Sequence, residues 1–185
     1  CIRDRLSKML KKYMQEKNIE ILTGTKVLSV ETTALGAKVN VETEQGNKSF
    51  EAEKVLVAVG RRTYTESLDL AAAGIANDRG RITVNDKMQT NVEGIYAIGD
   101  CLGKVMLAHV ASAQGEVAAE NIMGANKKFN GATSPSCVYT DPEFAGVGLT
   151  EEQAKEQNKA YEVGRFPLAA NGKALIANGG QGVVK

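Results

Sequence analysis

A carboxylate beside glycine, at the end of an apolar run, is the clearest candidate for chemistry in this chain. Asp100 follows Gly99 directly, after the run that begins at Ile95. In open α/β sheets, ligands bind at the carboxyl ends of the strands, where a carboxylate grips the sugar hydroxyls of a nucleotide cofactor. An ionised aspartate only accepts hydrogen bonds, so a polyol is its natural partner. The alternative is that Asp100 caps a helix or a turn.

The residues that follow predict a second half of the same site. Met106, Leu107, Ala108 and His109 begin a long helix expected over 107–123. The first N–H groups of a helix lack internal partners and the helix dipole makes that end positive, so a ring that becomes anionic on reduction would be stabilised there. His109 is the only histidine. An orienting or packing role is favoured over a catalytic base, because no carboxylate lies at a spacing that would fix its tautomer.

Gly60 is a third candidate, since it ends the continuous apolar run 55–59. A glycine at the end of a buried strand lets a cofactor approach the backbone, because no Cβ intervenes. The alternative is a turn glycine followed by two solvated arginines.

The three cysteines give weaker evidence of a functional site. Cys101 has no CxxC or CxxxxC partner, so an inert thiol is favoured over a redox centre. Three widely spaced cysteines and a single histidine predict no metal site.

Composition excludes several classes of function. Lys and Arg number 23 against 22 Asp and Glu, so no broad field attracts nucleic acid or anionic lipid. No run approaches the length of apolar residues that a spanning helix needs, so no membrane partner is expected. Free thiols favour a reducing compartment, and we expect the cytoplasm, with the mitochondrial matrix as the alternative.

The elements that position these residues alternate between helix and strand. Helical spacing covers 2–13, and strict alternation over 38–42 predicts a strand that turns back to pair with 48–52. Further strands are expected at 19–22 and 26–30, and 55–59 reads as a strand covered on both faces. The first sixty residues therefore predict a helix, a meander and a buried strand.

The pattern continues beyond residue 60 with a second buried strand and a long helix. The elements expected there are a short helix 68–73 capped by Gly74, a turn at 77–80, a strand 94–100, the helix 107–123 ended by Gly124, and a polar linker 126–136. After the linker, strands are expected at 137–140, 144–149 and 161–166, around one helix that opens with a capping box at 150–153.

Taken in order, these segments resemble the pyridine nucleotide–disulfide oxidoreductases. The segments that carry the resemblance are 55–62, 90–100, 106–109, 137–143 and 164–171. Together they cover essentially the whole chain in one register. Glutathione reductases typically have Leu-Thr-Pro where this chain has Leu107-Ala108-His109, which favours the lipoamide branch of the family. One departure is Thr63, where the family usually has proline.

The resemblance implies an α/β fold made of parts of two nucleotide-binding domains, for FAD and for NAD(P), and the start of an α+β dimerisation domain. The implied boundaries are 1–58 for the second half of the NAD-binding domain and 59–133 for the C-terminal part of the FAD-binding domain. Residues 134–185 would be the start of the dimerisation domain, truncated.

The resemblance also implies roles for single residues. Asp100 would bind the ribitol or the adjoining part of FAD, and residues 106–109 would contact the flavin. Gly60 would lie against NAD, and Val27 would touch its adenine side. No residue of this chain is assigned a catalytic role.

The function implied is that of the lipoamide branch, which reoxidises dihydrolipoamide groups with NAD+ through FAD and a redox disulfide. Its members are homodimers that serve the lipoyl-bearing subunits of 2-oxo acid dehydrogenase complexes or the glycine cleavage system. The alternatives are another FAD-dependent disulfide reductase, like glutathione or mercuric reductase, and a non-catalytic flavin-binding module that dimerises.

Family motifs that the chain lacks predict its behaviour in isolation. The chain opens inside a helical pattern and stops at the start of a strand, so we expect an internal piece of a longer protein. The family's CxxxxC disulfide and its GxGxxG motifs would lie upstream of Cys1, and its acid–base histidine downstream of Lys185. Electrons pass from a thiol pair to flavin to NAD, so purified residues 1–185 should show no dihydrolipoamide:NAD activity. FAD-dependent lipoamide reduction by this piece would contradict the prediction.

Overall fold

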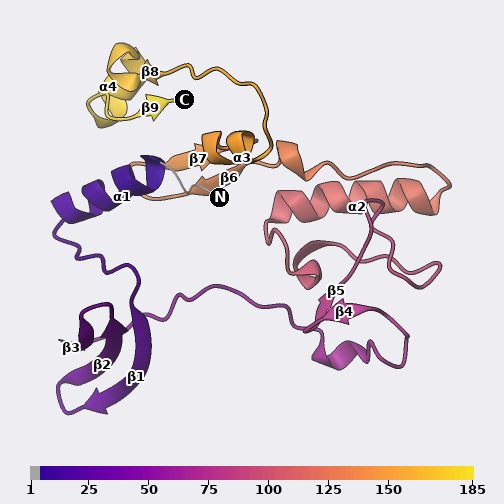
Figure 1. Ribbon diagram of the computed structural model, residues 1–185, viewed down its shortest axis with the longest axis horizontal. Helices are drawn as coiled ribbons and strands as arrows, with labels where there is room; N and C mark the ends of the chain where they lie inside the picture. The colour runs from indigo at the N-terminus through magenta and orange to yellow at the C-terminus, as the bar shows by residue number, and fades with distance from the viewer. Residues whose placement is uncertain (1–4) are drawn as a thin grey trace. The chain divides into compact units, whose positions relative to one another are not determined.

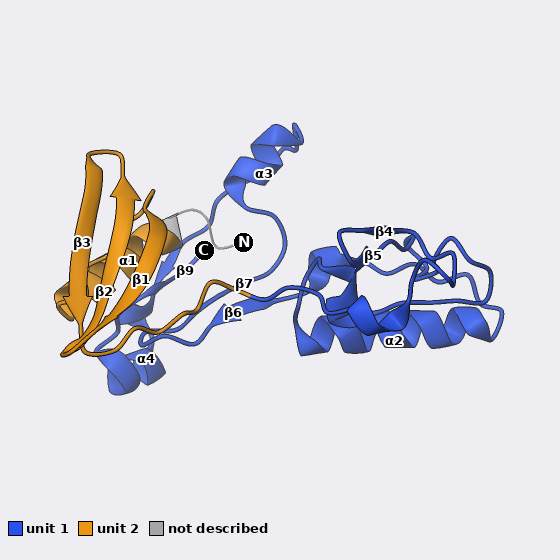
Figure 2. Cartoon of the chain, turned by 90° about the horizontal axis from the view of Figure 1, so that it is seen from below, with its two compact units in different colours: residues 1–4, 61–185 blue, residues 5–60 orange. Residues whose placement is uncertain are grey.

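The computed structural model describes residues 5–185. Their contacts divide the chain into two units, residues 5–60 and residues 61–185 (Figure 2). Helices and strands occur in both units, in agreement with the mixed α/β class expected from the sequence. Within residues 5–185, no helix combines the length and the apolar character needed to cross a membrane.

The unit of residues 5–60 is a helix followed by a three-stranded antiparallel sheet (Figure 1). Its elements are α1 (Arg5–Glu16), β1 (Lys26–Thr33), β2 (Gly36–Thr43) and β3 (Gly46–Ala52). The hairpin expected between 38–42 and 48–52 is confirmed, with Val39 opposite Phe50. β2 is the central strand, so its backbone groups find partners on both sides.

The entry to β2 depends on a glycine. Gly36 has a φ of +149°, and a Cβ added there would collide with the carbonyl oxygen of Ala52 at the end of β3. Only a residue without a side chain allows this approach of two strands together with that backbone angle.

Two strands expected in this unit are wrong. Residues 19–22 and 55–59 form no regular structure and carry no strand pairing. Leu56 is 90% exposed and Val59 is 92% exposed. A β-forming run becomes a strand only where a neighbour supplies N–H and C=O partners, and no described residue pairs with either segment.

The unit of residues 61–185 contains the longest helix, α2 (Ala108–Ile122), which ends before Gly124 as expected. Its other regular elements are β4 (Asn77–Asp78), β5 (Arg81–Ile82), β6 (Ser136–Val138), β7 (Phe144–Gly146), α3 (Glu151–Glu156), β8 (Phe166–Pro167), α4 (Gly172–Asn178) and β9 (Val183–Val184). Short 3₁₀ turns are η1 (Glu66–Leu68), η2 (Gly99–Leu102), η3 (Gly131–Thr133) and η4 (Leu168–Ala170). β4 and β5 form a short hairpin at the turn expected over 77–80.

The core of this unit lies between α2 and the segment from 70 to 102. It is formed by buried apolar side chains, namely Leu70, Ile82, Met88, Leu102 and Ala118. Val110, near the start of α2, is 1% exposed. The first half of α2 is thus anchored by packing rather than by its own helix propensity.

The buried strand expected at 94–100 is wrong. Only one isolated bridge, between Gln89 and Tyr96, pairs this segment, and Ile98 is 39% exposed. The apolar run does not become a strand because no strand within residues 5–185 pairs with it. Residues 99–102 then form the η2 turn.

Other local expectations are partly wrong. The helix expected over 68–73 is replaced by η1 and a series of turns, because Asp69 has a φ of +43° and ends the 3₁₀ turn. The strands expected at 137–140, 144–149 and 161–166 are shortened to β6, β7 and β8, the stretches that have partners. The capping box at the start of α3 is confirmed, with Thr150 and Gln153 bonded reciprocally.

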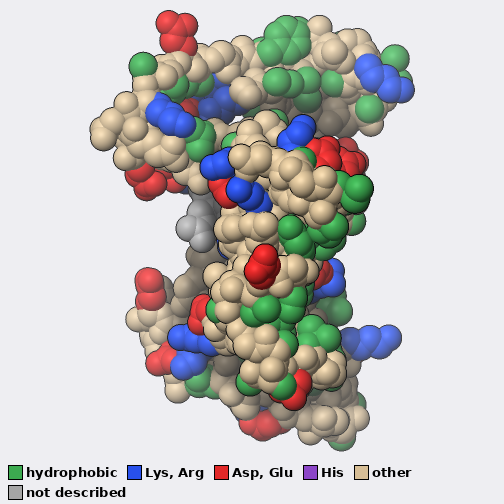
Figure 3. Space-filling view, turned by 90° about the vertical axis from the view of Figure 1, so that its right-hand side faces the viewer, with side chains coloured by type: hydrophobic (Ala, Val, Ile, Leu, Met, Phe, Trp, Pro, Cys, Tyr) green, Lys and Arg blue, Asp and Glu red, His purple; other side chains and the backbone are tan. Residues whose placement is uncertain are grey.

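Charges are mixed on the surface. Figure 3 shows Lys and Arg side chains interspersed with Asp and Glu side chains on the visible face. This distribution agrees with the near balance of charge in the sequence, which gave no reason to expect binding of nucleic acid.

The C-terminal end of α2 is held by one buried side chain. The Asn121 amide donates to the carbonyl oxygens of Lys87 at 3.1 Å and Lys127 at 3.0 Å. Its oxygen accepts from the Lys127 N–H at 2.8 Å. Because Asn121 is only 7% exposed, water cannot easily replace these three bonds.

We therefore predict that Asn121→Ala loosens this end of the helix. Orphaned polar groups cost about 1–3 kcal/mol each, so the Lys127 amide should exchange its hydrogen at least about tenfold faster. Hydrogen exchange followed by mass spectrometry measures this. Asn130→Ala is the control, because it removes only an exposed bond to the Ala132 N–H. It should change the exchange rate of the Lys127 amide by less than about threefold. Equal rates in Asn121→Ala and the unchanged protein would refute the assignment.

Candidate functional site

Asp100 lies in the η2 turn, and its carboxylate is paired with an arginine. The Arg61 Nη2 lies 2.8 Å from the Asp100 Oδ2. The Asp100 side chain is 40% exposed, so the carboxylate is accessible to a ligand. Its backbone carbonyl accepts from the Gly103 N–H at 3.0 Å, which closes the turn.

The η2 turn is fastened to the first half of α2. The Gly99 N–H donates to the Gln114 Oε1 at 2.7 Å, and Gln114 is 4% exposed. Gly99 has a φ of +74°, and a Cβ there would lie 3.2 Å from the Cβ of Ala111. A side chain at this position would disturb both the turn and its packing, so glycine brings Asp100 close to the helix.

The start of α2 offers free donors. Leu107 is the N-cap, with an extended backbone and no side-chain cap. Its carbonyl accepts from the N–H groups of Val110 and Ala111. The N–H groups of Ala108 and His109 have no acceptor within the described residues. These two amides sit at the positive end of the helix dipole and are available to an acceptor or a partly anionic ring.

The side chains of the same segment differ in exposure. Met106 and Leu107 are half-buried, whereas Ala108 and His109 are exposed. The His109 Nε2 lies 2.9 Å from the carbonyl oxygen of Pro135. A carbonyl only accepts, so Nε2 carries the hydrogen and, in the neutral ring, Nδ1 keeps its lone pair. This bond gives the ring an orienting partner that the sequence did not reveal.

The residues assigned to NAD lie in the other unit. Gly60 has a φ of +104°, with open space where a Cβ would point. Val27 is in β1, opposite Val41, and is 57% exposed. Asp100 and the start of α2 therefore belong to the unit of residues 61–185, whereas Gly60 and Val27 belong to the unit of residues 5–60.

Sequence reasoning missed two residues of the cluster. Arg61 has no role in the expected site and appears only in the alternative for Gly60, as one of two solvated arginines, although its place after a glycine that ends an apolar run is a usable signal. Gln114 lies on the face of α2 that also buries Val110 and Ala118. A polar residue on an otherwise apolar helix face is a signal for a buried hydrogen bond.

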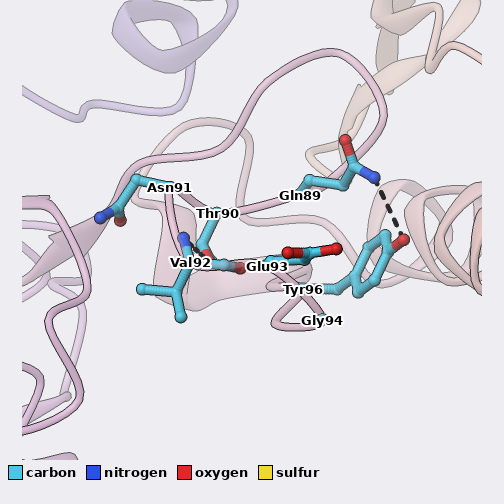
Figure 4. A pocket seen from close by; sticks show the side chains of 7 residues that line it. All are labelled: Gln89, Thr90, Asn91, Val92, Glu93, Gly94 and Tyr96. Carbon is cyan, nitrogen blue, oxygen red and sulfur yellow. Dashed lines mark hydrogen bonds between the residues drawn. The ribbon is translucent and has the colours of Figure 1, made fainter.

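Two cavities in this unit do not include Asp100. The first, of about 470 Å³, is lined by the loop 89–94 and Tyr96. Figure 4 shows that the Gln89 side chain points to the Tyr96 hydroxyl, with which it forms a 3.2 Å hydrogen bond. The Thr90 hydroxyl bonds to the backbone of its own turn, so these polar groups serve the loop.

The second cavity, of about 380 Å³, is mostly apolar and lies beside α2, between Val110 and Phe129. No cluster of His, Cys, Asp and Glu within residues 5–185 could hold a metal ion.

Comparison with known proteins decides the family. The sequence pattern of the pyridine nucleotide-disulphide oxidoreductases matches residues 1–115, and the pattern of their dimerisation domain matches residues 134–185. The chain belongs to the pyridine nucleotide-disulphide oxidoreductase family. The family resemblance and the fold class expected from the sequence, nucleotide-binding regions followed by the start of a dimerisation domain, are confirmed.

Similar proteins within the family include two dihydrolipoyl dehydrogenases. A dihydrolipoyl dehydrogenase of Thermus scotoductus is 44% identical over 96% of this chain and 39% of its own length. A mitochondrial dihydrolipoyl dehydrogenase of Arabidopsis thaliana is 39% identical over 97% of this chain and 36% of its own. The chain thus spans about two fifths of the length of these relatives.

Solved structures agree with the family assignment. The crystal structure of LpdA from Mycobacterium tuberculosis matches with a TM-score of 0.83 and 29% identity, over 92% of this chain and 37% of that one. The flavoprotein disulfide reductase RclA from Escherichia coli matches with a TM-score of 0.79 and 26% identity, over 96% of this chain and 40% of that one.

The thiol beside the candidate site is placed for packing. The Cys101 Sγ donates to the carbonyl oxygen of Ile98 at 3.1 Å. Burial raises the pKa of this thiol, with Asp100 adding to the effect. A raised pKa lowers the thiolate fraction at any pH below it, so the structure supports an inert thiol.

We predict that folding protects Cys101 from alkylation. At pH 8, iodoacetamide should modify Cys101 at least about tenfold more slowly in the folded protein than in urea, because both access and thiolate fraction fall. Peptide mass spectrometry gives the rate at each cysteine. Cys137 is exposed and should be protected less. Equal rates at Cys101 in the folded and unfolded states would contradict this.

Proposed function

We propose that this chain is part of a dihydrolipoyl dehydrogenase, a flavoprotein that reoxidises dihydrolipoamide groups with NAD+ through FAD and a redox disulfide. The observation that carries the proposal is the 38–44% identity to proteins of that name over 96–98% of this chain. The sequence Leu107-Ala108-His109 supports the same branch of the family.

The groups around Asp100 fit an FAD cofactor. A carboxylate accepts from the ribitol hydroxyls, and the free N–H groups of Ala108 and His109 donate toward the pyrimidine edge of the flavin. Met106 and Leu107 supply half-buried apolar surface beside the ring. When bound, FAD would supply the electron transfer between a dithiol and NAD+. The chain's own residues bind and orient it.

For NAD we propose the unit of residues 5–60. Gly60 offers an open backbone with no Cβ in the way of a ligand. Val27 offers an exposed apolar side chain that suits the face of an adenine ring. We propose domain boundaries of 1–58 for the second half of the NAD-binding domain, 59–133 for the C-terminal part of the FAD-binding domain, and 134–185 for the start of the dimerisation domain.

The partners follow from the same proposal. The match of residues 134–185 to a dimerisation domain supports a homodimer. Lipoyl-bearing subunits of 2-oxo acid dehydrogenase complexes or of the glycine cleavage system would supply the dithiol. Bacterial and mitochondrial relatives support the cytoplasm or the mitochondrial matrix as the compartment.

Another disulfide reductase is the second candidate. The likeness to RclA, a flavoprotein disulfide reductase, favours this alternative. Assays of the full-length protein with dihydrolipoamide and NAD+, and with other disulfide substrates and NADPH, separate the two. Oxidation of dihydrolipoamide with NAD+ at a much higher kcat/KM than any other pair supports our proposal, and the reverse order would overturn it.

We predict that Asp100→Ala weakens FAD binding in the full-length protein. Removing the acceptor orphans hydroxyls that it would bind, which costs about 1–3 kcal/mol, or roughly 5- to 150-fold in Kd. Fluorescence titration of the apoprotein with FAD measures the change. Asp86→Ala is the matched control, because it removes another exposed carboxylate in a 2.8 Å ion pair, with Lys128. An unchanged Kd for Asp100→Ala would count against the site.

A further inference from the structure

The carboxylate of Asp100 has a single partner among the described residues. The Arg61 Nη2 lies 2.8 Å from its Oδ2, and no other described residue forms a hydrogen bond or ion pair with that carboxylate. Arg61 comes from a distant part of the sequence, where it follows Gly60, yet it meets the one acidic side chain of the η2 turn. Its neighbour Arg62 makes only a 3.9 Å contact, with Glu66.

This ion pair has little to do with the stability of the fold. The Arg61 side chain is 73% exposed and that of Asp100 is 40% exposed. Exposed pairs contribute little to stability, because water and salt screen them and the side chains lose entropy. We therefore look for the role of this contact in the orientation of the Asp100 carboxylate.

The contact restricts the remaining freedom of the Asp100 side chain. The turn backbone is already fixed on two sides, by the bond from the Gly99 N–H to Gln114 and by that from the Gly103 N–H to the Asp100 carbonyl. Only rotation of the side chain is left. A guanidinium is planar and always charged, so it holds a carboxylate in one orientation better than a lysine does.

We propose that Arg61 is a positioning residue for cofactor binding, which orients the Asp100 carboxylate toward the cofactor hydroxyls. The inference rests on the proposed function, because it assumes that Asp100 binds FAD. Arg61 acts through Asp100 and does not itself need to contact the cofactor. Preorganising the acceptor reduces the entropy lost when the hydroxyls bind, so the effect appears as affinity for FAD.

A double-mutant cycle in the full-length apoprotein tests this inference. FAD is titrated into the unchanged protein, Arg61→Gln, Arg61→Lys, Asp100→Asn and the double variant Arg61→Gln/Asp100→Asn. Arg61→Gln should raise the Kd about 3- to 10-fold, and Arg61→Lys should restore part of the loss, because an ammonium keeps the charge without the planar fork. In the Asp100→Asn background, Arg61→Gln should change the Kd by less than about twofold, since the ion pair is already gone.

Arg62, the neighbour of Arg61, is the control position. Arg62→Gln should leave the Kd within about twofold, and circular dichroism of each apoprotein shows whether it has folded. Equal weakening by Arg61→Gln in both backgrounds would overturn the inference, because Arg61 would then act without Asp100. The same holds if Arg61→Gln has no effect while Asp100→Asn weakens binding, an outcome that leaves the proposed function intact. An unchanged Kd in Asp100→Asn and in Asp100→Ala would instead remove the FAD site itself, and the inference with it.

Discussion

The hydrogen bond from the Gly99 N–H to the Gln114 side chain is the contact on which the candidate site depends. It is buried, 2.7 Å long, and joins a turn to the middle of a helix. Leaving a buried N–H without an acceptor costs free energy, so this bond stabilises the position of the turn against α2. Asp100 is the next residue along the chain, so this bond helps to hold it close to α2.

The groups that would meet a ligand contrast with the framework beneath them. Leu102 and Val110 are almost fully buried and hold the turn and the helix in place. The N–H groups of Ala108 and His109 have no acceptor within the described residues, and the Asp100 carboxylate has one described partner, Arg61. These polar groups belong to residues that are accessible to water, which a ligand can displace. Accessible polar groups beside an apolar core suit binding more than stability.

Two apolar runs show how far the sequence could predict the fold. The segments 55–59 and 94–100 were both expected to be buried strands, because residues 55–59 and 95–98 are apolar and rich in β-forming side chains. Neither pairs as a strand within residues 5–185, apart from the single bridge at Tyr96. Propensity is local, whereas a strand depends on the backbone of a neighbour, so composition alone could not decide the outcome.

Local sequence determined the elements whose causes lie within a few residues. The stop of α2 at Gly124, the hairpin between β2 and β3, and the capping box of α3 all have their partners nearby in the chain. Sequence patterns also indicated the family and marked Asp100 and His109 as candidates. Only the tertiary structure paired Asp100 with Arg61, and His109 with Pro135. Those pairs join residues far apart in the sequence. Periodicity reports only on neighbours within one helix or strand, so it cannot predict which distant residues come into contact on folding.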